Sequence, residues 1–146
     1  MNDQEFSLEG DVALVTGSGR GLGHAMAMRL AELGASVAVH DQTTGAPAEY
    51  GEFADLAASE AAVAAFGRPT VALTGDIGDE EHVSALVRDA ESALGPLTIL
   101  VNAAGGDIGA RGGKPKPNTA LGITLEDMRA LIDRNLIGTM LVCKAA

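Results

Sequence analysis

Residues 11–23 read DVALVTGSGRGLG, and this stretch decides the fold. The apolar run 11–16 is typical of a buried strand, and it passes through four glycines into a predicted helix at 22–33 that Gly34 closes. Glycine loses the most backbone freedom on folding, so four of them in seven residues need a physical reason. A strand that enters a helix through such a turn aims the unpaired N–H groups of the helix at one spot, which suits a phosphate. A tight turn without a ligand is the alternative.

Short β-branched runs alternate with helical patterns along the rest of the chain. This rhythm predicts an α/β fold, a doubly wound parallel sheet with right-handed crossovers and helices on both faces. One domain over residues 1–146 is expected. The predicted strands and helices are, in chain order, strand 11–16, helix 22–33, strand 36–40, helix 53–66, strand 70–74, helix 79–94, strand 97–101 and a helix from Thr124 to 146.

Composition narrows the class of protein. The net charge of −10 disfavours nucleic acid and anionic membrane surfaces as partners. The acidic segment 1–11 lacks the apolar core of a signal peptide, and no apolar run approaches bilayer length. The single cysteine, Cys143, is expected on the buried side of the last helix and cannot form an internal disulfide. Together these features predict a soluble cytoplasmic protein without a metal site.

Residues 102–123 break the strand and helix rhythm. Six glycines and two prolines make a regular element impossible there, and loops of this length in compact domains are usually functional or disordered. In segment 106–118, Arg111, Lys114 and Lys116 are basic in an acidic chain, so they could meet an anionic substrate or a neighbouring subunit. A disordered, solvated loop is the alternative.

Four motifs in this order resemble those of the short-chain dehydrogenase/reductase family. The turn at 16–23 fits the family pattern T-G-x-x-x-G-x-G, and residues 102–105 after the fourth strand look like the family's N-A-A-G motif. Asp76 and Ile77 match an Asp-apolar pair after the third strand, and Asn135 matches a helix asparagine. The resemblance implies a Rossmann-type fold of which the chain holds the first four strands. It also implies these cofactor-binding residues: Gly17, Ser18, Gly19, Arg20, Gly21, Leu22, Gly23, Asp41, Asp76, Ile77, Asn102, Ala103, Ala104 and Gly105.

Asp41 favours NAD as the cofactor. It ends the second strand, 18 residues after Gly23, where a carboxylate can accept hydrogen bonds from both ribose hydroxyls. A 2′-phosphate would meet a like charge there, so NADP is less favoured. Arg20 pulls the other way, because the family sometimes uses a basic residue at this place for that phosphate. A solvated turn acid is the alternative for Asp41.

By resemblance, Asn135 distorts its helix and holds a water in a proton relay as part of the family's Asn-Ser-Tyr-Lys catalytic group. An ordinary exposed asparagine is the alternative. The chain has no Tyr-x-x-x-Lys motif, because Tyr50 is followed at that offset by Ala54 and Lys144 is preceded by Met140. The resemblance therefore implies the cofactor half of a longer enzyme, with the catalytic Ser, Tyr and Lys beyond residue 146.

The function so implied is that of an oxidoreductase that transfers a hydride between NAD(P) and a secondary alcohol or ketone of a small molecule. The alternatives are a non-catalytic dinucleotide-binding module and an inactive fragment. Family members are commonly dimers or tetramers that pack through the helix beginning near Thr124, so a homodimer or homotetramer is expected, with Met128 and Leu131 as candidate contacts.

Overall fold

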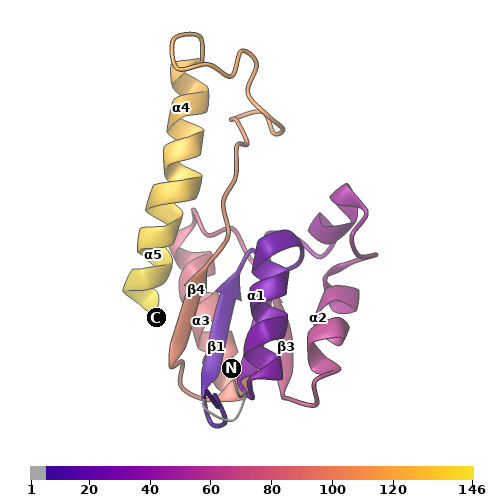
Figure 1. The fold of residues 1–146 in the computed structure, drawn as a ribbon. Coiled ribbons are helices and arrows are strands. Elements are labelled where there is room, and N and C mark those ends of the chain that lie inside the picture. The colour runs from indigo at the N-terminus through magenta and orange to yellow at the C-terminus, as the bar shows by residue number, and fades with distance from the viewer. Residues whose placement is uncertain (1–5) are drawn as a thin grey trace.

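The computed structural model describes residues 6–146, and its four strands form one parallel sheet in the order β3-β2-β1-β4 (Figure 1). This confirms the predicted α/β, Rossmann-like fold. In register, Thr16 of β1 lies opposite Asn102 of β4, and Asp41 of β2 lies opposite Thr74 of β3. The carboxyl ends of all four strands therefore share one edge of the sheet. The strands are β1 Val12–Thr16, β2 Ser36–Asp41, β3 Thr70–Thr74 and β4 Ile99–Asn102.

Helices cover both faces of the sheet. Successive strand residues point to opposite faces, so each strand contributes apolar side chains to both layers of helices. Ala13 and Val15 of β1 belong to an apolar cluster with α1 (Gly21–Glu32) and α2 (Leu56–Ala64). Leu14 faces the other way, toward α3 (Glu80–Leu94) and α5 (Gly138–Ala145). The central strands β1 and β2 are almost fully buried, whereas the outer strands β3 and β4 are half-buried.

The segment between β2 and α2 differs from the prediction. Part of the expected polar loop is a 3-10 helix, η2 (Ala46–Tyr50), whose Pro47 is buried. Helix α2 then begins at Leu56 instead of Phe53, because the Asp55 side chain accepts a hydrogen bond from the Ala58 N–H at 2.8 Å and caps the helix there.

The last helix is not uniform. A π-helical segment, η3 (Asp133–Ile137), separates α4 (Leu125–Ile132) from α5. Helix α5 packs beside β4 and α3, and α4 extends beyond the carboxyl edge of the sheet (Figure 1). Thr124 caps its start as predicted, accepting from the Asp127 N–H at 3.1 Å. Cys143 is exposed on α5, so its predicted place on the buried side was wrong. Val142, the preceding residue, fills the buried position instead.

Within residues 6–146, no helix is both long and apolar enough to cross a membrane. The first five residues of the acidic segment 1–11, which carries no signal-peptide pattern, lie outside the described residues.

Candidate functional site

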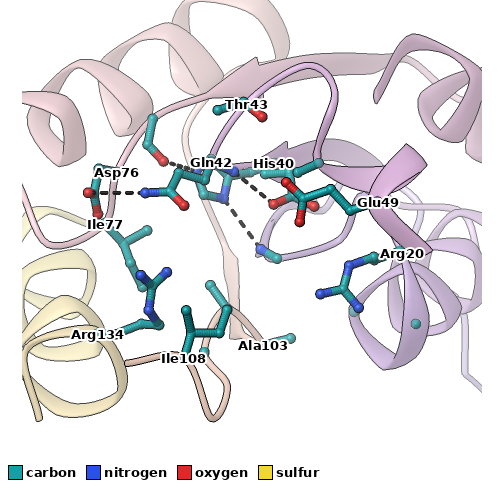
Figure 2. A pocket seen from close by; sticks show the side chains of 18 of the residues that line it. Arg20, His40, Gln42, Thr43, Glu49, Asp76, Ile77, Ala103, Ile108 and Arg134 are labelled. Atoms are coloured by element: carbon teal, nitrogen blue, oxygen red, sulfur yellow. Dashed lines mark hydrogen bonds between the residues drawn. The ribbon is translucent and has the colours of Figure 1, made fainter. Parts of the chain in front are cut away.

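A cavity of about 300 Å³ opens at the carboxyl edge of the sheet, where the ends of all four strands meet (Figure 2). This edge is where ligands bind in open α/β sheets. Eleven of the fifteen predicted site residues line it, and Ser18, Gly19, Asn102 and Asn135 do not. The predicted residues that line the cavity are Gly17, Arg20, Gly21, Leu22, Gly23, Asp41, Asp76, Ile77, Ala103, Ala104 and Gly105.

The glycines of the turn between β1 and α1 serve mainly the protein's own close packing. A Cβ on Gly17 would lie 2.6 Å from the Cα of Ala104, and one on Gly23 would lie 2.2 Å from the carbonyl oxygen of Gly17. A Cβ on Gly19 would meet a carboxylate oxygen at 2.5 Å. At Gly21 a Cβ would meet nothing within 4 Å, and its φ of +59° is the left-handed region that favours glycine. The need for small residues predicted from the sequence thus has two causes, close backbone contact and turn geometry.

The start of α1 offers unpaired N–H groups at the cavity. The side chain of the N-cap residue Arg20 makes no capping hydrogen bond, and first-turn amides have no partner within a helix. The Gly21 N–H donates to Glu52 Oε2 at 2.8 Å, so a carboxylate already occupies one of these donors. Leu22 and Gly23 line the cavity, and Leu22 is 79% exposed. The remaining first-turn N–H groups and the positive end of the helix dipole are the features that suit an anionic group of a ligand.

Ser18 is buried, and its side chain forms hydrogen bonds with backbone groups of the protein. Its Oγ donates to the Val15 carbonyl at 2.7 Å and accepts from the His40 N–H at 2.9 Å. His40 lines the cavity, and burial lowers the pKa of its imidazole below the ordinary value of 6.5. The side chain of Ser18 thus fixes the turn to β2.

Three carboxylates gather at the β2 and β3 side of the cavity, namely those of Asp41, Glu49 and Asp76. Asp41 Oδ1 accepts from the Gln42 N–H at 2.8 Å, and its Oδ2 faces the glycine turn. Gln42 also donates from Nε2 to Asp76 Oδ2 at 3.2 Å, which links the ends of β2 and β3.

Arg20 is the basic residue of the glycine turn and lines the same cavity as these acids. Its guanidinium lies over the Tyr50 ring, 3.8 Å from the centroid, in a cation–π contact that holds it at the mouth of the cavity.

The opposite wall comes from segment 103–105, Ile108 and Arg134. Segment 103–105 is tied to β1, because Ala104 N–H donates to Thr16 Oγ1 at 3.2 Å. Arg134 of η3 points toward Ile77 (Figure 2), and its buried Nε has no hydrogen-bond partner among the described residues. The cavity therefore contains a guanidinium with unused hydrogen-bonding capacity.

Two predicted residues lie behind this wall. Asn102 contacts Cys143, with Nδ2 at 3.3 Å from Sγ, and its buried Oδ1 lacks a partner within the described structure. Asn135 Oδ1 accepts from the Gly106 N–H at 2.8 Å, and its Nδ2 donates to the carbonyls of Gly106 and Leu131 at 3.0 and 2.9 Å. Asn135 thus fastens the glycine-rich loop to the π-helical segment.

Sequence reasoning missed eight cavity residues. Gln42 and Thr43 directly follow the second strand, and Arg134 directly precedes Asn135, so proximity to a motif could have indicated them. Ala46 and Glu49 belong to η2, which lies in an expected loop, and His40 was interpreted as a core residue of a strand. Gly75 directly follows β3, and Ile108 lies in segment 102–123. The full set is His40, Gln42, Thr43, Ala46, Glu49, Gly75, Ile108 and Arg134.

A parallel sheet with a glycine-rich turn after its first strand and a cavity at its carboxyl edge defines a Rossmann-like nucleotide-binding type of fold. The family pattern of the short chain dehydrogenases matches residues 11–146. The chain belongs to the short-chain dehydrogenase family.

Two relatives and a solved structure are similar to this chain over nearly its whole length. A hydroxynaphthalene reductase of Aspergillus fumigatus is 34% identical over 95% of this chain and 45% of its own length. A cyclohexanol dehydrogenase of a Rhodococcus species is 32% identical over 94% of this chain and 51% of its own. The crystal structure of a short-chain type dehydrogenase/reductase from Mycobacterium marinum superposes with a TM-score of 0.81 at 26% identity, covering all of this chain and 53% of the other. The chain thus spans about half the length of these relatives.

Proposed function

We propose that residues 1–146 form the cofactor-binding half of an oxidoreductase that transfers a hydride between NAD(P) and a secondary alcohol or ketone of a small molecule. The observation that carries the proposal is the convergence of the glycine turn, Asp41, the Asp76-Ile77 pair and segment 103–105 on one cavity. Relatives named as a hydroxynaphthalene reductase and a cyclohexanol dehydrogenase support the substrate class.

The residues around the cavity fit a dinucleotide. The open space at Gly21 and the first-turn amides of Leu22 and Gly23 suit a diphosphate, since they combine N–H donors with the positive end of the helix dipole. The Asp41 carboxylate lies against the turn, where it would accept from ribose hydroxyls. Asp76 and Ile77 would border the adenine, and Asn102 would hold the wall behind segment 103–105 in place.

NAD is the favoured cofactor on electrostatic grounds. A 2′-phosphate beside Asp41 would meet a second carboxylate, that of Glu49, at the same side of the cavity. Arg20 is the cation that could compensate, but its guanidinium is stacked on the Tyr50 ring. Like charges at short range disfavour the phosphate.

When bound, the nicotinamide ring would supply hydride transfer. The chain's own residues bind and orient, and Asn135 holds the segment 105–106 against the helix at the π-helical turn, a feature often found at functional sites. A proton-transferring Tyr-Lys pair is not among these 146 residues, so the proposed reaction needs these groups from a further part of the protein.

A homodimer or homotetramer in the cytoplasm is part of the proposal. Apolar side chains stay exposed along α4, η3 and α5, which supports packing against a second copy. Light scattering coupled to gel filtration would measure the assembly. The exposed apolar residues of this helix are Leu125, Met128, Ile132, Leu136, Ile137 and Met140.

The test of the function has two stages. Calorimetry should show saturable binding of NAD⁺ to the protein, with NADP⁺ weaker. An assay of the complete gene product with secondary alcohols and NAD⁺ should then show formation of NADH. Binding without turnover would favour a non-catalytic dinucleotide-binding module, and absence of binding by either form would overturn the proposal.

A further inference from the structure

His40 is a buried histidine at the junction of three segments that line the cavity (Figure 2). It lies near the end of β2, directly before Asp41, and 1% of its surface is exposed. A polar side chain at this depth needs hydrogen-bond partners. Those partners are the glycine turn on one side and the end of β3 on the other.

The ring bonds fix the tautomer of His40. The Gly17 N–H donates to Nδ1 at 3.3 Å, and Nε2 lies 3.0 Å from the carbonyl oxygen of Gly75. A backbone N–H can only donate and a carbonyl oxygen can only accept. Nδ1 is therefore unprotonated, and Nε2 carries the hydrogen. The surroundings select the neutral ring with its hydrogen on Nε2.

Backbone bonds of the same residue reinforce this junction. The His40 N–H donates to Ser18 Oγ at 2.9 Å, and the Ser18 N–H donates to the His40 carbonyl at 2.8 Å. His40 thus ties the turn to β2 through Gly17 and Ser18 and ties β2 to β3 through Gly75. Asp76 follows Gly75 and Asp41 follows His40, so both acids are adjacent in sequence to residues that this junction joins.

We propose that His40 is a positioning residue, whose neutral ring sets the glycine turn and the end of β3 in the arrangement that binds the dinucleotide. The inference rests on the proposed function, since it concerns the same cavity. His40 acts through Gly17 and Gly75, so its role is separate from that of the groups that would touch the ligand.

Protonation of His40 would undo this arrangement. A second ring N–H would point at the Gly17 N–H, and two donors cannot bond to each other. Burial lowers the pKa of His40, while the hydrogen bond to Gly75 O and the carboxylates of Asp41 and Asp76 act in the opposite direction. Dinucleotide affinity should therefore fall as the pH drops through that lowered pKa. The carboxylates that act on the ring are those of Asp41 on β2 and Asp76 after β3. The other charged side chains that line the same cavity are Arg20, Glu49 and Arg134, and His82 on α3 lies beside Gly75.

Two variants distinguish the effect of the ring's hydrogen bonds from the effect of its size. His40→Asn can keep an acceptor near the position of Nδ1 and cannot be protonated, whereas His40→Phe keeps the ring and loses both bonds. We expect NAD⁺ affinity, measured by calorimetry, to fall about tenfold in His40→Phe and by about threefold or less in His40→Asn. His82→Asn, a change at an exposed histidine on α3, is the matched control and should bind like the unaltered protein.

The pH profile of binding distinguishes positioning from simple support of the fold. As the pH falls from neutrality through the lowered pKa of His40, NAD⁺ affinity of the unaltered protein and of His82→Asn should fall, and that of His40→Asn should stay level. Long-range ¹H–¹⁵N NMR on the unaltered protein should show the neutral Nε2–H tautomer at neutral pH, whether or not the variants fold.

Each outcome decides between the two proposals. An Nδ1–H tautomer, equal affinity in all variants, or equal pH profiles for the unaltered protein and His40→Asn would overturn the role of His40 and leave the proposed function standing. No binding of NAD⁺ by the unaltered protein at any pH would overturn both.

Discussion

The chain has two glycine-rich stretches beside the same cavity, the turn at 17–23 and the loop at 105–122, and they use glycine differently. In the turn, a Cβ on Gly17 or Gly23 would collide with backbone atoms. In the loop, a Cβ on Gly112 or Gly113 would meet nothing within 4 Å, and both residues have positive φ. At Gly17 and Gly23 the close contact is with backbone atoms. In the loop, the contacts at Gly105, Gly109 and Gly122 are with side chains, and only Gly112 and Gly113 need glycine for the backbone path alone. Substitutions in the two stretches should therefore differ in both size and kind of effect.

The largest effect should come from Gly23→Ala. Its Cβ would lie 2.2 Å from the Gly17 carbonyl oxygen, a backbone atom that cannot move aside without distorting the turn. We expect the free energy of unfolding to fall by about 3 kcal/mol, with NAD⁺ affinity reduced at least about tenfold. Urea denaturation and calorimetry would measure the two quantities. Gly45→Ala, at a site with open space and negative φ, should change neither; equal loss in both variants would contradict the contrast.

Arg134→Met tests the wall opposite the turn. Its guanidinium has an unpartnered Nε at the cavity, so we expect it to form charge-assisted or stacking contacts with the dinucleotide. NAD⁺ affinity should fall about tenfold, with little change in stability. Arg129→Met removes an exposed arginine from the neighbouring α4 and serves as control. An affinity change no larger than that of the control would remove Arg134 from the site.

Stability should also depend on pH, because burial lowers the pKa of two histidines from 6.5, His24 on α1 and His40 on β2. Above that value both states are neutral and the histidines contribute no slope. As the pH falls below 6.5, the two histidines are protonated in the unfolded state and remain neutral in the folded state. The free energy of unfolding therefore drops, by at most about 1.4 kcal/mol per pH unit for each histidine, until the folded-state pKa values are reached.

Urea titrations at a series of pH values would measure this slope. His40→Asn should show a shallower slope, since of these two histidines only His24 still contributes. A slope unchanged by that substitution would mean that other groups cause it.

Asn135→Ala should affect the loop more than the core. It removes three hydrogen bonds at an exposed position, two to Gly106 and one to Leu131, so the stability loss should be about 1 kcal/mol. Amide exchange at Gly106 should become faster, whereas exchange within β1 should not change. Thr139→Val removes a neighbouring bond to the helix backbone and leaves Gly106 alone. Unchanged Gly106 exchange in Asn135→Ala would show that this bond does not hold the loop.

The smallest effect should come from Gly112, an open position in the loop. Gly112 has φ of +78° in open space, so Gly112→Ala should cost about 1 kcal/mol and Gly112→Asn less, because asparagine tolerates this conformation. NAD⁺ affinity should not change in either variant. A loss as large as that of Gly23→Ala would mean that the loop is packed as tightly as the turn.

The sequence predicted the sheet, its helices and most of the cavity, because these depend on local patterns. Buried β-branched runs mark β1 and β2, Gly34 ends α1, and Thr124 caps α4 as expected. The motif residues at the ends of all four strands meet because parallel strands place their carboxyl ends together.

The features that the sequence did not predict share a cause, because each depends on tertiary contacts. Helix η2 forms where Pro47 is buried against the turn, and Cys143 turns outward because Val142 takes the buried position. His40 reads as one residue of a buried strand, and only the folded structure brings Gly17 and Gly75 to its two ring nitrogens. The π-helical segment around Asn135 was implied as a distortion by resemblance and had no signal in periodicity.

The most direct test of the central account is amide chemical-shift mapping of the ¹⁵N-labelled protein during titration with NAD⁺. We predict that the largest shifts fall on Leu22, Gly23, Gln42 and Ile77, with the 109–122 part of the loop unaffected. Shifts confined to the loop, or absent at saturating NAD⁺, would contradict a dinucleotide site at the mouth of the β1–α1 turn.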